Sequence, residues 1–231
     1  MFGTPHRHFR SVDSTNTRAR ELATAGAPGG AIVTASAQTE GRGRQGRTWT
    51  APPGKALLYS AILRPLDERH LLLPLAVPLA VCEAAEELEP GIECGVKWPN
   101  DVWVGGRKLA GVLIEARPQD GWAVIGVGLN LAIGTEEFPP ELRDTAISLG
   151  GIEAESAAAA LNRRLGDWVE AGEEKVLGAW RERDALRGRE IAWEGGSGVA
   201  DGIDDRGYLI VTTAGGGSSV LGAGEVHLTR I

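Results

Sequence analysis

The sequence predicts an α+β protein in which a mixed sheet with helices forms a larger first domain and a small β-barrel follows it. Two observations carry this prediction. Through residue 186, runs of strand length alternate with longer stretches of helical apolar spacing. After residue 186, the chain is rich in glycine, lacks helical periodicity and contains several short β-type runs. A chain of 231 residues is long enough for both domains, which we place at residues 1–186 and 187–231.

The first elements lie within residues 11–26, where the sequence predicts the end of a strand, a turn and a helix. The helix is expected over residues 18–25, and Gly26 is expected to end it. Ser14 or Thr15 could cap this helix, because a hydroxyl oxygen at that position accepts a hydrogen bond from a free backbone N–H group.

Two strands and a long helix follow. A short β-branched strand is expected over residues 31–35 and a longer strand over residues 56–63. From Asp67 to Leu88 the apolar spacing favours a helix. Pro74 and Pro78 must kink or restart that helix, because proline removes a backbone donor and clashes with the preceding turn.

The middle of the chain contains three further predicted strands, at Glu93–Trp98, Lys108–Ala116 and Trp122–Leu131. Val104–Arg107 supplies the glycine turn of a hairpin between the first two. Residues 154–185 are expected to form two helices that break near Ala171 and Gly172.

The C-terminal barrel is predicted to have about five strands. Its clearest β-type runs are Glu190–Trp193, Tyr208–Thr212 and Glu225–Leu228. Residues 215–219, with the sequence Gly-Gly-Gly-Ser-Ser, are most simply a hairpin loop between two of its strands.

The composition is ordinary for a globular protein and argues against a nucleic-acid partner. Hydrophobic residues make up 42% of the chain and charged residues 24%. A formal net charge of −7 is unlike that of a general nucleic-acid binder, which usually carries a basic surplus. Local basic sites remain compatible with it, and Arg42, Arg44 and Arg47 form one.

The sequence predicts neither a membrane span nor a secretion signal. The longest apolar stretch, residues 71–82, contains two prolines and falls short of the roughly 20 residues that a span needs. The first residues lack the charged and apolar regions of a signal peptide, so we expect a cytoplasmic protein. Cys82 is expected to be a buried free thiol. The two cysteines and four histidines have no metal-ligand spacing, so we predict neither a zinc site nor a histidine base.

A glycine-rich loop with three arginines lies within Gly41–Trp49. Its first six residues satisfy the pattern G-x-G-x-x-G of dinucleotide-binding folds. That motif needs a helix that opens on the last glycine and holds the pyrophosphate at its N-terminus. Pro52, Pro53 and Gly54 forbid a good helix here, and we therefore disfavour a dinucleotide-binding oxidoreductase.

The chemistry of the same loop suits anions. Guanidinium groups make forked hydrogen bonds to phosphate and carboxylate oxygens, and glycines let a loop be mobile when empty and ordered when full. Such a lid would hold two anions together and exclude water from a reactive product. The alternative is a solvated surface loop without a ligand, and the segment alone does not decide between them.

A second group of polar residues follows the predicted strands. The segment Lys97–Asp101 ends a strand at a turn, since Pro99 cannot continue a central ladder. Asn100 and Asp101 offer oxygens suited to Mg²⁺ beside nucleotide phosphates, and a plain turn pair is the alternative. Lys108 opens a strand whose later residues look buried, where an ammonium group is unfavourable unless it meets an anion. A surface lysine at a hairpin is the alternative there.

In their order along the chain, three segments resemble those of the biotin protein ligases: Gly41–Trp49, Lys97–Asp101 and Lys108–Glu115. The resemblance covers nearly the whole chain, although the C-terminal part matches by pattern more than by motif. It implies a mixed-sheet catalytic domain of the biotin/lipoate ligase type with a small SH3-like β-barrel. It also implies an enzyme that uses ATP and Mg²⁺ to activate biotin as biotinyl-5′-AMP and transfers it to a lysine of a biotin carboxyl carrier domain.

The resemblance implies roles for individual residues as well. The catalytic residues would be Lys108 and Arg44, with Mg²⁺ held by Asn100 and Asp101. The residues expected to bind biotin are Ser14, Thr15, Asn16, Gln38, Arg42, Gly43, Arg44, Lys108 and Gly111. Those expected to bind the nucleotide are Arg42, Arg44, Trp49, Asn100 and Asn130. Hydroxyls and amides suit a neutral ureido ring, which requires uncharged donors and acceptors.

Further residues have weaker assignments. Gly126 and Gly128 leave room for a flat ring, and Gly111 allows a close backbone approach. Trp49 could pack either on the adenine or in the core, and Lys97 is expected to be an electrostatic or structural partner. Contacts of the C-terminal domain with the nucleotide or the acceptor stay open, with Glu225 and Arg230 as candidates.

Several alternatives accompany this resemblance. Attachment of lipoate or octanoate is the closest rival, but its different glycine-rich motif is not found. A non-enzymatic biotin-binding module is another, and it would not need Lys108, Asn100 and Asp101 together. Some family members carry an N-terminal winged helix that represses transcription; with about ten residues before Ser11, we expect this chain to lack it. Dimers occur in the family, so a homodimer is compatible with the sequence.

Overall fold

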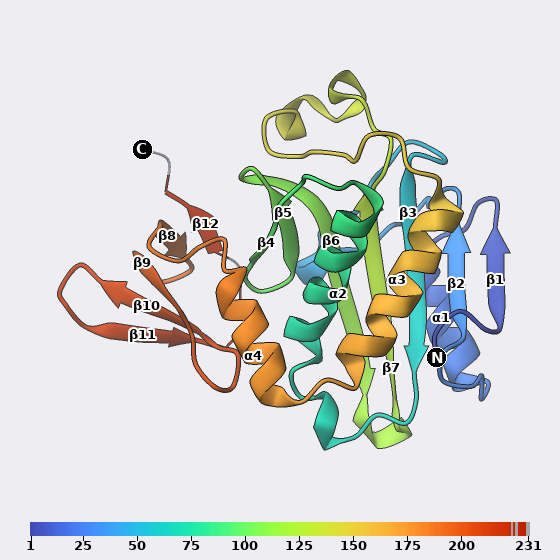
Figure 1. Ribbon diagram of the computed structural model, residues 1–231, viewed down its shortest axis with the longest axis horizontal. Coiled ribbons are helices and arrows are strands. Elements are labelled where there is room, and N and C mark those ends of the chain that lie inside the picture. Colours follow the sequence, from blue (N-terminus) through green and yellow to red (C-terminus); the bar gives the residue numbers. More distant parts are fainter. Residues whose placement is uncertain (223, 225, 230–231) are drawn as a thin grey trace.

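The computed structural model describes residues 1–222, 224 and 226–229, and these residues form two sheets with helices around them (Figure 1). Within the described residues, one sheet has seven strands and the other has five. The smaller sheet lies at one end of the molecule beside the last helix (Figure 1). No helix in this part of the chain is both long enough and apolar enough to cross a membrane.

The larger sheet is mixed. Its strands are β1 (His6–Phe9), β2 (Ile32–Ala35), β3 (Ala56–Leu63), β4 (Cys94–Lys97), β5 (Asp101–Val104), β6 (Arg107–Arg117) and β7 (Trp122–Asn130). Their order across the sheet is β1-β2-β3-β7-β6-β5-β4. β1 runs parallel to β2, whereas every other neighbouring pair is antiparallel. This arrangement confirms the predicted α+β class with a mixed sheet.

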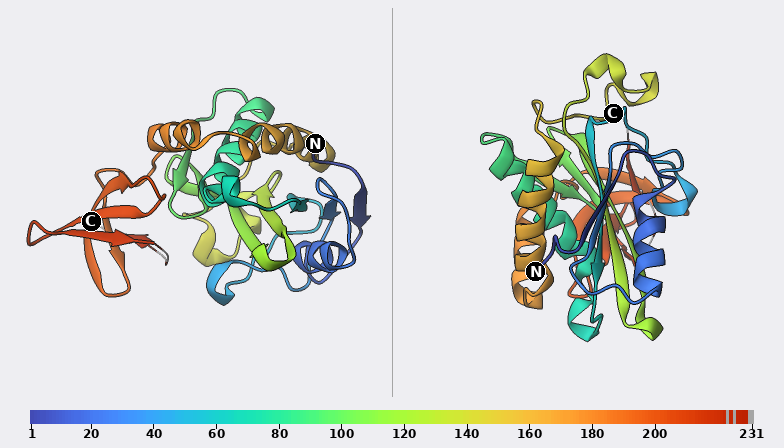
Figure 2. Two further views of the ribbon diagram at one scale, coloured as in Figure 1. Left: turned by 90° about the horizontal axis from the view of Figure 1, so that it is seen from below. Right: turned by 90° about the vertical axis from the view of Figure 1, so that its right-hand side faces the viewer.

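Helices cover both faces of the larger sheet, as Figure 2 shows. They are α1 (Thr15–Thr24), α2 (Leu73–Leu88), α3 (Ala154–Val169) and α4 (Glu173–Glu182). All of β3 is buried as a result: Ala61 belongs to the large core with α2 and α3, whereas Ile62 belongs to a smaller core with Ala19 of α1. Successive side chains of a strand point to opposite faces, so a central strand covered on both faces is apolar throughout.

The smaller sheet packs against the larger unit. Its strands are β8 (Glu190–Trp193), β9 (Gly196–Ile203), β10 (Leu209–Thr213), β11 (Ser218–Leu221) and β12 (Val226–Leu228). They are antiparallel in the order β11-β10-β9-β8-β12. The indole Nε1 of Trp98 donates to the carbonyl oxygen of Gly207 at 3.0 Å. Five short strands confirm the predicted C-terminal β unit and are consistent with an SH3-like barrel.

The first helix begins earlier than its predicted start at Arg18. α1 starts at Thr15, and Ser14 occupies the N-cap position without a capping hydrogen bond from its side chain. The Thr15 hydroxyl lies 3.0 Å from Oε1 of Gln38 instead. The suggestion that one of these hydroxyls caps the helix is therefore wrong, because a partner distant in the sequence binds the threonine.

The second helix begins later than predicted. A short 3-10 turn over Glu68–His70 precedes α2, which starts at Leu73. Pro74 lies in the first turn, where a missing N–H group has no intrahelical partner to lose. The helix continues through Pro78. The restart expected from the prolines is thus confirmed at Pro74 alone.

Two short strands of the larger sheet are absent from the prediction. β1 is a polar edge strand with three of its four residues exposed, so it lacks the alternation by which strands are recognised. β5 opens with Asp101, a residue type that is depleted in strands. The predicted hairpin turn is therefore correct at Gly105 and Gly106, but it joins β5 to β6. Similarly, Ser218 and Ser219 belong to β11 and not to the loop before it.

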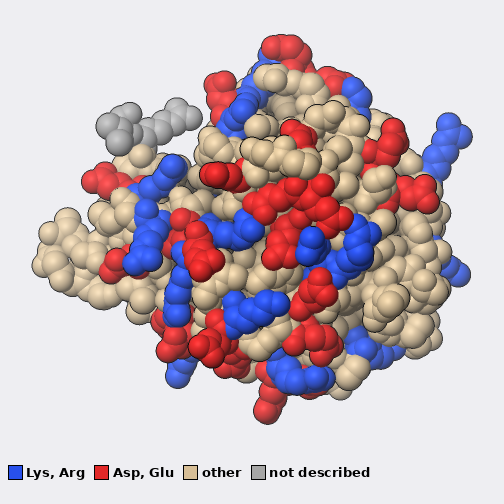
Figure 3. Space-filling model, viewed as in Figure 1, with Lys and Arg blue, Asp and Glu red and all other residues tan. Residues whose placement is uncertain are grey.

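Acidic and basic side chains are interspersed on the face that carries α2, α3 and α4 (Figure 3). The most buried of the ion pairs between these helices joins Arg183, just after α4, to Glu86 of α2 at 2.6 and 2.9 Å. Arg183 also donates to the carbonyl oxygen of Cys94 at 3.1 Å. Burial alone would raise the pKa of Glu86, but the hydrogen bonds from Arg183 and from the backbone of Cys94 outweigh it and lower the pKa.

Arg183→Met should therefore lower the free energy of unfolding by about 1.5–3 kcal/mol near pH 7, since a partly buried carboxylate would lose its guanidinium. A carboxyl group with a lowered folded pKa stabilises the protein above its unfolded pKa, here 4.5, and this contribution disappears as the pH falls through the folded pKa. Urea unfolding of both proteins at neutral and acidic pH measures the difference, which should shrink below about pH 4.5.

Arg164→Met is the matched control, because Arg164 makes more exposed ion pairs with Glu83 and Glu87. Its effect should stay within about 1 kcal/mol. A loss for Arg183→Met that is the same at both pH values would contradict this account of Glu86.

Candidate functional site

A cavity of about 680 Å³ lies between the central strands, the loop over residues 41–49 and the segment over residues 138–146. It is lined by every residue that the sequence assigns to a site: Ser14, Thr15, Asn16, Gln38, Arg42, Gly43, Arg44, Trp49, Asn100, Asp101, Lys108, Gly111 and Asn130. These residues come from five separate stretches of the chain that the sheet brings to one place. The polarity and charge of the lining side chains differ from one end of the cavity to the other.

The arginine loop forms a tight hairpin over the cavity. The backbone N–H of Gly43 donates to the carbonyl oxygen of Arg47 at 2.7 Å, and that of Trp49 donates to Gly41 at 3.0 Å. At its tip, Gln45 has a left-handed backbone with φ 54°. Gly41 is required here, because a Cβ atom would lie 2.2 Å from the carbonyl oxygen of Trp49. The loop therefore has a defined shape with its arginines at fixed positions.

One end of the cavity is polar and uncharged. Oε1 of Gln38 accepts hydrogen bonds from the backbone N–H and the hydroxyl of Thr15, at 2.7 and 3.0 Å. The hydroxyl oxygen of Ser60 lies 2.8 Å from that of Thr15 and 2.6 Å from Oδ1 of Asn16. Ser14, Thr15, Asn16 and Ser60 are all buried. Ser60 was not predicted, although a serine inside the apolar run of β3 was a signal that could have identified it.

A buried tyrosine precedes Ser60 in β3, and its side chain reaches the helix on the opposite face of the sheet. The hydroxyl of Tyr59 donates to Oδ1 of Asn162 at 2.7 Å, which ties β3 to α3. Burial raises the pKa of Tyr59, so its phenol group stays neutral across the physiological range. Tyr59 adds no charge to the cavity that it lines.

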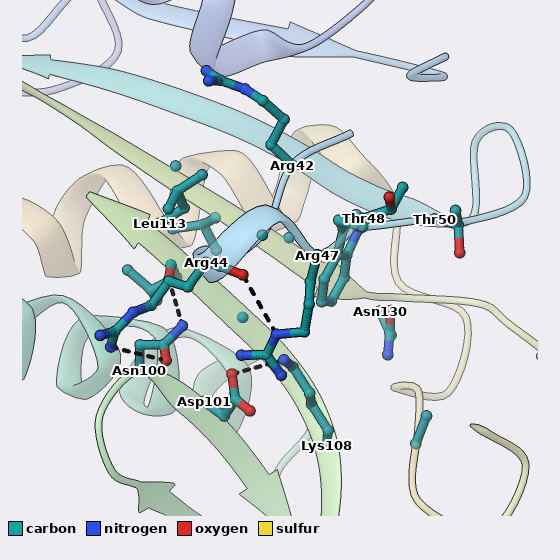
Figure 4. A pocket seen from close by; sticks show the side chains of 18 of the residues that line it. Arg42, Arg44, Arg47, Thr48, Thr50, Asn100, Asp101, Lys108, Leu113 and Asn130 are labelled. Carbon is teal, nitrogen blue, oxygen red and sulfur yellow. Dashed lines mark hydrogen bonds and ion pairs between the residues drawn. The ribbon is translucent and has the colours of Figure 1, made fainter. Parts of the chain in front are cut away.

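Arg42 differs from the other loop arginines in its direction. In Figure 4 its side chain points away from the region where Arg44, Arg47 and Lys108 converge. Its Nη2 donates to Oε2 of Glu115 at 2.9 Å. Glu115 also accepts from Nδ2 of Asn16 at 2.9 Å. The sequence prediction gave Glu115 no role, because nothing in the sequence indicates that it meets two residues so distant along the chain.

The opposite end of the cavity is rich in charge. Nζ of Lys108 lies 2.7 Å from Oδ1 of Asp101, and their side chains are 31% and 11% exposed. Nη1 of Arg44 lies 3.4 Å from Oδ1 of Asn100, whose Nδ2 donates to the carbonyl oxygen of Val112 at 2.7 Å. Figure 4 shows these side chains directed toward one another. Among the described residues that line the cavity, Asp101 is the one carboxylate beside several cations, so this end suits an anion that can share Lys108 with Asp101.

The middle of the cavity is occupied by an indole. A Cβ atom on Gly128 would lie 2.4 Å from the ring of Trp49, and one on Gly111 would lie 3.1 Å from it. Nζ of Lys108 is 5.7 Å from the ring centroid, within the range of a cation–π contact. In this structure the ring that Gly111 and Gly128 accommodate is that of Trp49, whereas Gly126 faces the side chain of Asn16.

The remaining wall comes from an irregular segment that the sequence prediction missed. Nδ2 of the buried Asn130 donates to the carbonyl oxygen of Ile147 at 2.9 Å, which holds this segment against β7. The backbone of Thr145 accepts from the N–H of Lys108 at 2.7 Å. Phe138 and Leu142 complete the lining. Apart from a short 3-10 turn at Pro140–Leu142, this segment is irregular and has no charged motif, so the sequence gives no signal for a site there.

The C-terminal sheet reaches the cavity through β12, where His227 and Leu228 line it. Glu225 and Arg230, named above as candidates, lie outside the described residues. Among the residues that the structure describes, no group of three or more His, Cys, Asp and Glu side chains could hold a metal ion by itself. A metal at Asn100 and Asp101 would therefore need further oxygens from a ligand.

Comparisons with known proteins agree on one family. The model of the biotin/lipoate A/B protein ligase family matches residues 8–131. The chain is 35% identical over 248 positions to the biotin–[acetyl-CoA-carboxylase] ligase of Mycobacterium tuberculosis, covering 98% of this chain and 91% of that protein. It is 33% identical over 224 positions to the bifunctional ligase/repressor BirA of Bacillus spizizenii, covering 89% and 68%.

A solved structure resembles the fold over its full length. The biotin protein ligase from Aquifex aeolicus, in complex with biotin and ATP, superposes with a TM-score of 0.84 and 29% sequence identity. The match covers 99% of this chain and 100% of that one. The similarity therefore extends over both sheets.

The contact between α1 and β7 generates a stability prediction. Gly126→Ala should lower the free energy of unfolding by about 1–3 kcal/mol, because a Cβ atom there would lie 2.1 Å from Oδ1 of Asn16 and displace its buried hydrogen bonds. Gly178→Ala is the matched control: a Cβ in that position of α4 meets nothing within 4 Å, so helix propensity should raise stability by about 0.5–1 kcal/mol. Denaturant unfolding that ranks the two variants in the opposite order would contradict this packing.

Proposed function

The chain belongs to the biotin/lipoate A/B protein ligase family, and from that premise we propose that it is an ATP-dependent biotin protein ligase. It activates biotin as biotinyl-5′-AMP and transfers the biotinyl group to a lysine of a biotin carboxyl carrier domain. The observation that carries this proposal is the polarity of one cavity. One end of it offers uncharged hydrogen-bonding groups, and the other end is cationic and contains Lys108.

The uncharged end fits the ureido ring of biotin. Thr15, Asn16 and Gln38 offer hydroxyl and amide groups that are already fixed by hydrogen bonds to one another and to Ser60. A neutral ring with a carbonyl and two N–H groups needs such donors and acceptors and no formal charge. A preformed polar network of this kind favours one orientation of the ring over others.

The cationic end fits the reacting groups. A carboxylate oxygen of biotin forms a bond to the α-phosphorus of ATP while the bond from that phosphorus to the bridging oxygen of pyrophosphate breaks. Both reactants are anions, so their approach requires positive charge from Lys108 and Arg44. The chain supplies position and charge in this step, and no enzyme nucleophile is needed.

In the second step the amine of the acceptor lysine attacks the carbonyl carbon of the mixed anhydride. The bond from that carbon to the phosphate oxygen breaks, AMP leaves and the amine loses a proton. The hairpin over residues 41–49 excludes water from the anhydride until the amine arrives. Trp49, already seated on Gly111 and Gly128, offers a flat apolar surface against which the adenine packs.

Asn100 and Asp101 fit a magnesium ion that is bound jointly with phosphates. Mg²⁺ usually takes one or two carboxylates and completes its octahedron with phosphate oxygens and water. The carboxylate of Asp101 and the amide oxygen of the neighbouring Asn100 match that pattern. When bound, the ion would neutralise phosphate charge as pyrophosphate departs.

Four further assignments belong to this proposal. Residues 1–186 form the catalytic domain and residues 187–231 a small C-terminal domain, supported by the separate sheets. The protein acts in the cytoplasm, where a carrier domain and ATP are available. Its net charge of −7 supports an enzyme without a nucleic-acid partner. A homodimer remains compatible with the exposed edge strand β1.

Exchange of labelled pyrophosphate into ATP tests the proposal. With Mg²⁺ present, exchange should depend on biotin, because the label enters ATP only through a reversible adenylate. Lipoate and octanoate serve as parallel substrates. Exchange with those acids alone would move the protein to the lipoate branch of the family, and no exchange by the folded protein would favour a binding module.

Lys108→Ala should slow adenylate formation about 100- to 1,000-fold, since it removes a cation of the end where the two anions react. Rapid-quench measurement of biotinyl-5′-AMP formation gives the rate. Lys175→Ala, a change to a lysine of α4 outside the cavity, is the control and should leave the rate unchanged. A normal rate for Lys108→Ala would remove this residue from the reaction.

Arg44→Gly should release free biotinyl-5′-AMP about tenfold faster, because the tip of the hairpin would lose the side chain that reaches Asn100. The adenylate is formed on the enzyme, excess substrate is removed and the released fraction is followed with time. Arg10→Gly, at an exposed arginine outside the cavity, should retain the adenylate as the unchanged protein does. Equal retention by Arg44→Gly would contradict its place in the lid.

A further inference from the structure

Glu115 links β6 to α1 and to the arginine hairpin. It lies near the end of β6, and Oε2 accepts hydrogen bonds from Asn16 of α1 and from Arg42 of the hairpin, both at 2.9 Å. Oε1 lies 3.7 Å from Nη1 of Arg20, also on α1. The Glu115 side chain is 25% exposed, so its charge is partly shielded from solvent and its bonds are stronger than those of a surface pair.

The carboxylate fixes which way the amide of Asn16 faces. Nδ2 of Asn16 is 2.9 Å from Glu115 and 3.3 Å from the carbonyl oxygen of Leu113, and both of these partners can only accept. The NH₂ group must therefore face them, which turns Oδ1 toward the hydroxyl of Ser60 at 2.6 Å. Because Asn16 is buried against Gly126, it has no room to adopt another position. Glu115, together with the Leu113 carbonyl, thus sets the polarity of the uncharged end.

The same carboxylate holds the root of the hairpin. Arg42 pairs through its backbone with Thr48, so it stands where the two arms of the hairpin meet the rest of the chain. Its guanidinium points away from the cationic end, as Figure 4 shows, and reaches Glu115 instead. Arg44, at the hairpin tip, faces Asn100. The two arginines therefore differ in role: Arg42 holds the root of the hairpin, and Arg44 faces the cationic end of the cavity.

We propose that Glu115 is a positioning residue that couples the order of the lid to the biotin site, a role that rests on the proposed function. Glu115 does not line the cavity. It acts through Asn16, whose amide it orients, and through Arg42, whose guanidinium it anchors. A ligand that fixes Asn16 also fixes Glu115 and with it the root of the hairpin, so biotin and lid order stabilise each other.

Glu115→Gln tests this coupling, since it keeps the shape of the side chain and removes the charge. Two readouts are needed. Limited trypsin digestion reports the order of the hairpin, because Arg44 and Arg47 are cleavage sites at its tip, and it needs no enzymatic activity. Steady-state kinetics report KM for biotin and kcat separately. Glu83→Gln is the matched control, since the Glu83 side chain is 28% exposed and pairs with Arg164 of α3, away from the hairpin.

Glu115→Gln should be cleaved at the hairpin about tenfold faster than the unchanged protein, with and without biotin, and its KM for biotin should rise about tenfold with kcat changed less. Glu83→Gln should match the unchanged protein in both. Hairpin cleavage at the unchanged rate would overturn the proposal. A lowered KM would overturn it too, because it would mean that Arg42 must leave Glu115 before biotin binds.

Arg42→Gln is a second variant for the case that Glu115→Gln does not fold. It removes the hydrogen bond between Arg42 and Glu115 by changing the residue of the loop. It should raise cleavage at Arg44 and Arg47 similarly, and the double variant should add little, since both changes break one contact. Full additivity would contradict the link. If the unchanged protein fails to exchange pyrophosphate, the proposed ligase function is contradicted. The trypsin comparison still tests whether Glu115 holds the hairpin through Arg42.

Discussion

The ammonium group of Lys108 beside Asp101 is the interaction on which the site depends. An ammonium over the middle of a sheet is unfavourable without an anion, and the carboxylate at 2.7 Å supplies one. β5 places Asp101 opposite Gly111 on β6, and there its carboxylate meets the ammonium group of Lys108. A substrate carboxylate or phosphate that enters the cavity meets a cation already in position, so little reorganisation is required when the reaction begins.

Polarity is divided along the cavity in a way that suits a substrate with a neutral head and an anionic tail. Hydroxyls and amides gather where α1 meets β3, and cations gather where the hairpin meets β5 and β6. The glycines of β6 and β7 make this possible, because any side chain at Gly126 would displace Asn16 and any at Gly128 would displace Trp49. A floor of bare backbone lets the two ends lie within the length of one ligand.

Much of this arrangement could be predicted from the sequence, and the exceptions have physical reasons. Central strands such as β3 and β7 are largely apolar, and a glycine stands at the break between α3 and α4. The sequence therefore predicted both features. β1 and β5 are four-residue strands with polar residues, and pairing with neighbours stabilises them more than their own sequence does. The motif residues converge as a group, whereas Glu115 acts through contacts between segments far apart, which no local pattern reveals.

A crystal structure of the protein with biotinyl-5′-AMP tests the central claim most directly. The account predicts that the ureido ring lies against Thr15, Asn16 and Gln38, and that the acyl phosphate lies between Lys108 and Arg44, with the adenine packed on Trp49. The Arg42–Glu115 contact should persist in that complex. A ligand bound in the reverse direction, or outside this cavity, would contradict the division of the site into a neutral end and a cationic end.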